Sequence, residues 1–293
     1  MVGALPLSER IASRCICCNG DQLRKSPAIL MPFVAKRVFD WEPVEITEAW
    51  GMKTLRLGMA YSLCNSLQCR ACGALFLDIR FSDAEMARLY SGYRDADYTA
   101  LRERFEPGYT TFNDALAERA TYLPQIEAMI GLHLGGPPHV LDWGGDKGLN
   151  TPFRDNAASL SVHDISGLTL ADGVAAVDRK GMAEARYDLV VCSNVLEHVP
   201  APAILLDDIV AVMSSETLLY LEVPRESYMI QNDGVENLAV GKKYWHEHIN
   251  FFTEMSIRIL TNRQGLVIVH FEILETEIYG RTGQLFCVIC RKA

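Results

Sequence analysis

The stretch VLDWGGDKGLN, residues 140–150, is a short apolar run that ends in an acid and is followed by three glycines. These residues are Asp142, Gly144, Gly145 and Gly148. Glycine carries no side chain, so it is used where the backbone must approach another group closely. The next apolar run ends in Asp164, at about the 20-residue offset where a carboxylate accepts ribose hydroxyls in nucleotide-binding folds. The pattern predicts a strand, a ligand-binding loop and a second strand that carries a ribose-binding acid.

The loop favours a ligand that has a ribose but no phosphate. A dinucleotide site requires the spacing G-x-G-x-x-G, and no register of this loop supplies it, because Asp146 stands where a glycine is needed. An acid at this point would also repel a pyrophosphate group. Asp tolerates a positive φ better than most residues, so the loop conformation itself can survive the substitution.

Short β-rich runs alternate with helix-like or turn-rich stretches from residue 138 onward. The runs are HVLDW, SLSVHDI, YDLVVCSNV, TLLYLEV, LVIVHFEIL and LFCVICR. Strands that alternate with helices predict an α/β fold with a doubly wound, Rossmann-like sheet that is mostly parallel. Too few residues separate the last two runs for a crossover helix, so we expect a C-terminal antiparallel hairpin.

The cysteines gather near the N-terminus. Of nine in the chain, six precede residue 73, and four of these form two CxxC pairs. The pairs are Cys15 with Cys18, and Cys69 with Cys72. Two such pairs predict a small four-cysteine module, residues 1–80, that binds structural Zn²⁺. Buried structural cysteines and a redox pair remain alternatives.

The interval between the two CxxC pairs is longer than in most zinc ribbons. Loop closure costs only a logarithmic term in chain length, whereas structural zinc contributes about 10–16 kcal/mol, so the interval is tolerable. We expect MPFVAKRVFDW and MKTLRLGMAYSL to supply strands within it. Residues 81–137 are predicted to be a helical connector, opened by the capping-box pair Ser82 and Glu85, and residues 138–293 the α/β domain.

Composition narrows the class of partner. The net charge of −9 argues against a duplex nucleic-acid footprint, and we expect a small-molecule or glycan substrate instead. No apolar run reaches the roughly 18–20 residues that span a bilayer, and no export signal is visible. These features predict a soluble, cytoplasmic protein whose oligomeric state is left open.

Three segments in order resemble class I S-adenosylmethionine-dependent methyltransferases. The glycine loop keeps the first motif of that family at Asp142, Gly144 and Gly148 and departs from it at Asp146. YDLVVCSNVLEHVPAP is similar to the family's fourth-strand segment, and TLLYLEVP to its fifth strand. The cysteine module and the segment EHINFF, Glu247 to Phe252, also resemble bacterial enzymes that methylate nucleotide-linked sugars and capsule or O-antigen glycans.

The resemblance implies roles for individual residues. S-adenosylmethionine would lie at Gly144, Gly145 and Gly148, where glycines give access to its methionine part. Asp142 would assist the donor's ammonium group, Asp164 would accept from the ribose hydroxyls, and Asn194 would flank the donor pocket. For the acceptor, the resemblance implies His248 as general base, with Glu247 orienting it or contacting a substrate hydroxyl.

The sequence also allows other interpretations of the site and of the function. His246 and His248 would share a face of an extended segment, so a metal site there is an alternative. The enzyme could methylate the oxygen or the carbon of a sugar, or it could serve an unrelated small molecule, because fold alone does not determine the acceptor. A third possibility is a zinc-bearing interaction protein whose methyltransferase domain is catalytically inactive.

Overall fold

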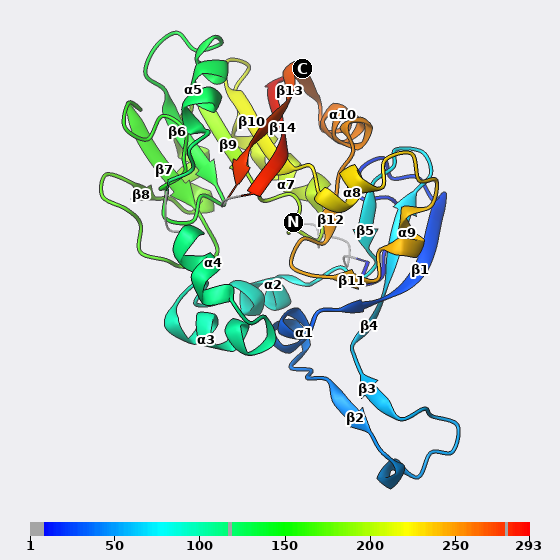
Figure 1. The fold of residues 1–293 in the computed structure, drawn as a ribbon. Helices are drawn as coiled ribbons and strands as arrows, with labels where there is room; N and C mark the ends of the chain where they lie inside the picture. The colour runs from blue at the N-terminus through cyan, green and yellow to red at the C-terminus, as the bar shows by residue number, and fades with distance from the viewer. Residues whose placement is uncertain (1–8, 117–118, 279–280) are drawn as a thin grey trace, which may run out of the picture.

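The computed structural model describes residues 9–116, 119–278 and 281–293. The first eight residues of the predicted zinc module, two of the predicted connector and two of the predicted hairpin lie outside these ranges. Figure 1 shows the seven-stranded and the five-stranded sheet on opposite sides of the molecule, with helices α2, α3 and α4 below them in this view. Within the described ranges, no helix has the length and apolar character needed to cross a bilayer.

The helices are α1 (Pro32–Phe39), α2 (Asp83–Tyr90), α3 (Ala96–Phe105), α4 (Tyr109–Leu116), α5 (Leu123–Gly131), α6 (Arg179–Glu184), α7 (Pro202–Val212), α8 (Ser227–Gln231), α9 (Leu238–Gly241) and α10 (Glu254–Arg263), with a 3₁₀ turn at Glu48–Trp50. The strands before residue 138 are β1 (Leu23–Leu30), β2 (Val44–Ile46), β3 (Gly58–Ala60), β4 (Leu63–Cys69) and β5 (Leu75–Leu77). The later strands are β6 (His139–Trp143), β7 (Ser159–His163), β8 (Ala175–Ala176), β9 (Leu189–Ser193), β10 (Leu218–Pro224), β11 (Tyr244–Trp245), β12 (Asn250–Phe251), β13 (Leu266–Ile278) and β14 (Arg281–Lys292).

The large sheet has the strand order β13-β14-β10-β9-β6-β7-β8. Strands β10, β9, β6, β7 and β8 run parallel to one another, whereas β14 is antiparallel to both β10 and β13. The predicted Rossmann-like sheet with a C-terminal antiparallel pair is therefore confirmed.

Both faces of the large sheet are buried, which explains the nearly continuous apolar runs of its strands. On one face, Val140 and Val191 pack with Ile126 and Ile130 of α5. On the other face, residues of the same strands, such as Leu141, pack with α7 and α10. Successive side chains of a strand point to opposite faces, so each run supplies two cores at once.

A second sheet is built mainly from the N-terminal region. Its order is β11-β1-β4-β5-β12, and its two edge strands come from residues 244–251. Asn250 pairs with Phe76 and Tyr244 with Ile29. The segment that carries the predicted base is therefore held between the edges of the N-terminal sheet, although it lies inside the predicted 138–293 domain.

Two local predictions have opposite outcomes. Ser82 and Glu85 form the predicted capping box of α2. MPFVAKRVFDW was expected to be a strand, but Pro32–Phe39 is helix α1, and this prediction is wrong. Pro32 fits the first turn of a helix, and Phe33, Val34 and Val38 are buried along one helical face, which an extended strand could not arrange.

A buried ion pair joins the connector to the segment of the second sheet that carries His248. Both terminal nitrogens of Arg102, on α3, donate to the carboxylate of Glu247, at 3.1 and 3.0 Å. Their side chains are only 7% and 11% exposed. Although burial would raise the pKa of Glu247, the charges of His246 and Arg102 lower it to about 2, so the carboxylate stays ionised.

We predict that Arg102→Met lowers the free energy of unfolding by about 3–5 kcal/mol, because it leaves a buried carboxylate without its partner. Arg104→Met on the same helix is the matched control. Arg104 is 59% exposed in its pair with Glu42, and loss of such a surface pair costs at most about 1 kcal/mol. Urea unfolding followed by circular dichroism measures both. Equal losses in the two variants would contradict the assigned role of Arg102.

Candidate functional site

The candidate site lies at the carboxyl ends of the parallel strands. The glycine loop follows β6, Asp164 follows β7, and Asn194 follows β9. Strand β6 lies between β7 and β9 in the sheet, so the three segments meet at one edge. In open α/β sheets, ligands bind beyond this edge.

Two glycines of the loop are required by the chain itself. Gly144 has φ +81°, and a Cβ there would lie 2.6 Å from Cγ2 of Val195. At Gly145 a Cβ would lie 2.5 Å from Cγ of Asp142. The glycines therefore let the loop fold directly over the Asp142 side chain and against the segment that follows β9.

Asp142 lies beneath this loop. It is only 4% exposed, and the hydroxyl of Thr151 donates a hydrogen bond to its carboxylate. Burial raises the pKa of Asp142 to about 7, and nearby Asp164 and Glu222 add to the effect, which the Thr151 hydrogen bond opposes.

Asp164 and Asn194 are anchored by neighbouring groups. The backbone N–H of Asp146 donates to Oδ2 of Asp164 at 2.9 Å, and the backbone N–H of Ser166 donates to Oδ1 at 2.7 Å. Each oxygen has a second lone pair for a ligand. Asn194 adopts φ +54°, and its amide donates to the buried Glu222 at 2.7 Å.

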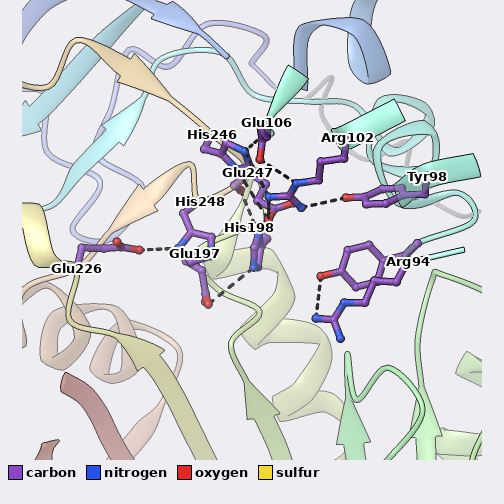
Figure 2. Close-up of polar contacts among 11 residues, drawn as sticks. Arg94, Tyr98, Arg102, Glu106, Glu197, His198, Glu226, His246, Glu247 and His248 are labelled. Atoms are coloured by element: carbon purple, nitrogen blue, oxygen red, sulfur yellow. Dashed lines mark hydrogen bonds and ion pairs between the residues drawn. The ribbon is translucent and has the colours of Figure 1, made fainter. Parts of the chain in front are cut away.

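His248 is the centre of a second group of polar side chains (Figure 2). Its Nδ1 lies 2.6 Å from Oε1 of Glu226, two residues beyond β10. The His248 and His198 rings meet edge to face, with centroids 4.5 Å apart. Nδ1 of His198 lies 3.1 Å from the backbone carbonyl oxygen of Glu247, so this nitrogen carries the proton.

The two histidines have opposite charge preferences. Burial alone would lower the pKa of His248, but the hydrogen bond to Glu226 and the charges of Glu226, Glu197 and Glu247 raise it to about 9. Burial and the neighbouring His248 charge lower the pKa of His198 to about 3. Near neutral pH the pair is a cationic His248 beside a neutral His198.

Glu197 is a buried carboxyl group that has no hydrogen-bond partner within the described part of the chain. It is 1% exposed, and its Oε1 lies 3.8 Å from Nε2 of His198. Burial raises its pKa to about 8, which the charge of His248 partly offsets. Glu197, His198 and His248 offer possible metal-ligand atoms within 4.8 Å of one another. Near neutral pH His248 is protonated, and this proton competes with a metal ion for the ring nitrogen.

The glycine loop and the histidine group are connected through one short segment. Val195 contacts Gly144. A turn begins at Val195 and contains Glu197 and His198, and the backbone N–H of His198 donates to the Val195 carbonyl. The same segment therefore contributes to both groups.

The structure separates some residues that the sequence suggested as partners. Glu247 is directed to Arg102, and His248 is paired with Glu226 instead. His246 lies 2.5 Å from a carboxylate oxygen of Glu106, so the two histidines of the suggested metal site face different groups. Sequence reasoning missed Glu226; the available signal was its position three residues after the predicted strand TLLYLEV.

The four predicted zinc ligands lie together. The Sγ atoms of Cys15 and Cys72 are 3.4 Å apart, those of Cys18 and Cys69 are 3.5 Å apart, and all four fall within 4.8 Å of one another. The backbone N–H groups of Cys17 and Gly20 point at Sγ of Cys15 and Cys18. The described cysteines form no disulfide, so this cluster could bind a zinc ion.

Comparisons with solved structures find similar proteins. The chain is similar to Burkholderia thailandensis 1,6-didemethyltoxoflavin-N1-methyltransferase with bound S-adenosylhomocysteine, at 19% identity over 67% of this chain and 89% of that chain, with a TM-score of 0.47. It is also similar to magnesium protoporphyrin IX methyltransferase from Synechocystis PCC 6803, at 15% identity over 67% and 99% of the chains, with a TM-score of 0.42. A comparison with curated proteins finds no match.

A family model described as a methyltransferase domain matches residues 111–271. This range is more than half of the chain, and it contains the glycine loop, Asp164, Asn194 and His248. The chain therefore belongs to the methyltransferase domain family and is an S-adenosylmethionine-dependent methyltransferase.

Proposed function

We propose that the enzyme methylates a sugar, either a nucleotide-linked sugar or a surface-glycan precursor, with His248 as the general base. The observation that carries this proposal is the pairing of His248 with Glu226 beside the unpartnered carboxyl of Glu197. The donor would occupy the glycine loop, with Asp164 accepting from its ribose hydroxyls and Asp142 and Asn194 at the edge of its pocket.

A polyhydroxylated acceptor suits the chemistry of this group. A carboxyl group accepts hydrogen bonds through its oxygens and, when protonated, also donates one, and a hydroxyl can serve as the partner in both cases. Glu197 is buried with both oxygens unpartnered among the described residues, so an acceptor hydroxyl would relieve the cost of that burial. The sequence resemblance of the cysteine module and EHINFF to sugar methyltransferases points to the same acceptor class.

The transfer itself is an in-line displacement at the sulfonium methyl group. The methyl–sulfur bond breaks with its electron pair going to sulfur, and a new bond forms between the methyl carbon and the acceptor oxygen or carbon. The acceptor proton passes to His248, and the donor leaves as neutral S-adenosylhomocysteine. His248 must begin this step neutral, and Glu226 then stabilises the imidazolium that forms.

We predict that the methylation rate rises with pH toward an inflection near pH 9. The pKa of His248 is raised to about 9, so its neutral form becomes dominant only above that value. His248→Gln should lower the rate by about 10²- to 10⁴-fold. Glu226→Gln should move the inflection toward about 6.5, because it removes the carboxylate that stabilises the protonated ring. Transfer of labelled methyl groups to a panel of nucleotide-linked sugars measures the rates.

The matched control is His270→Gln, since His270 lies on β13 with Glu272 as its partner. Its rate and pH profile should equal those of the unmodified enzyme. A His248→Gln variant with the normal rate would contradict the role of His248. Methylation of unrelated small molecules with no transfer to any sugar would contradict the acceptor class.

We propose further that Cys15, Cys18, Cys69 and Cys72 hold one structural zinc ion. Their thiolates would supply a closed tetrahedral set, which leaves no open position for chemistry. Cys69 ends β4 and Cys72 lies before β5, so the ion would fasten the N-terminal segment to the sheet that contains β12. The zinc would therefore support the acceptor side of the site without touching the donor.

We predict about one zinc ion per purified chain, measured by atomic emission, and a clear loss in Cys69→Ser. Cys64→Ser is the control, because Cys64 is buried but lies outside the four-cysteine cluster. Removal of zinc should unfold the N-terminal sheet while S-adenosylhomocysteine still binds. Chelator-treated protein that stays folded and methylates normally would contradict a structural role.

A further inference from the structure

The departure of Asp146 from the glycine motif is matched by a residue of the connector. Arg94 lies between α2 and α3, and its Nη1 is 3.2 Å from Oδ2 of Asp146. Figure 2 shows the Arg94 side chain pointing away from the Arg102 group, toward the ends of the strands. Both residues adopt left-handed backbone conformations, with φ +61° for Arg94 and +54° for Asp146.

This ion pair is incomplete on both sides. Nε of Arg94 and Oδ1 of Asp146 are buried and have no hydrogen-bond partner within the described residues. Nη2 of Arg94 donates to the Tyr93 hydroxyl at 3.1 Å, and the guanidinium lies over the Tyr93 ring, 4.7 Å from its centre. The side chain is thus held in place while part of its hydrogen-bonding fork is unused.

The unused atoms carry opposite charges, as do the two ends of an α-amino acid. A guanidinium binds a carboxylate through two parallel N–H groups, and a carboxylate accepts from an ammonium group. The S-adenosylmethionine donor ends in such an amino acid. Its ribose would lie at Asp164, whose carboxylate accepts the backbone N–H of Asp146, so the pair stands beside the proposed donor position.

We propose that Arg94 and Asp146 form the subsite for the amino-acid end of the donor. Arg94 binds the donor carboxylate, and Asp146 binds its ammonium group. An acid in the glycine loop would by itself repel the donor carboxylate, and Arg94 reverses that effect. The inference rests on the proposed donor site and adds two residues to it, one of them in the connector.

The test compares two ligands by calorimetric titration. S-adenosylhomocysteine carries the amino-acid group, whereas 5′-methylthioadenosine shares the thioadenosine part and lacks it. Arg94→Ala should weaken binding of S-adenosylhomocysteine by about 10- to 100-fold, because charge-assisted hydrogen bonds are lost. Its affinity for 5′-methylthioadenosine should change by less than about threefold. Arg104→Ala, an exposed arginine of the same connector, should bind both ligands normally.

A double variant separates donor binding from neutralisation of Asp146. Asp146→Gly restores the family's glycine, which accepts the observed φ without strain. If Arg94 and Asp146 bind the donor, Arg94→Ala with Asp146→Gly binds S-adenosylhomocysteine no more tightly than Arg94→Ala alone. Rescue of S-adenosylhomocysteine binding in the double variant, or an equal loss of both ligands in Arg94→Ala, would overturn the inference. Failure of the unmodified enzyme to bind either ligand would instead overturn the donor site itself.

Discussion

The ion pair between Arg102 and Glu247 is the interaction on which the arrangement of the site depends. It is buried and made through two hydrogen bonds, and it fixes the backbone of the segment that carries His248. The carbonyl of the same Glu247 faces Nδ1 of His198, so the pair also sets the tautomer of the second histidine. An exposed pair would be too weak to impose this geometry.

Several carboxyl groups lie around this pair, and their surroundings shift their pKa values in different directions. Glu247 stays ionised because Arg102 and His246 compensate its burial, whereas burial raises the pKa of Glu197 to about 8. Glu226 keeps His248 protonated near neutral pH. Groups with pKa values driven apart by their surroundings are typical of sites that move protons, which agrees with an enzyme that must take a proton from its acceptor.

Local patterns predicted much of this structure. The apolar runs gave the large sheet because each strand is buried on both faces, and the glycine loop was visible because its residues act within a few positions of one another. The residues that sequence reasoning missed act over long separations. Glu226 is 22 positions from His248, Arg94 is 52 from Asp146, and Arg102 is 145 from Glu247. No periodicity or motif reports such contacts, which the topology alone creates.

The central claim is that the glycine loop and Asp164 hold S-adenosylmethionine opposite His248. Calorimetric titration of S-adenosylhomocysteine into the intact protein and into Asp164→Ala tests it most directly. We expect one binding site in the intact protein and an affinity about 10- to 100-fold weaker in the variant, since the hydrogen bonds that the ribose hydroxyls donate to a charged carboxylate are lost. Equal affinity in the two proteins, or no binding by the intact protein, would contradict it.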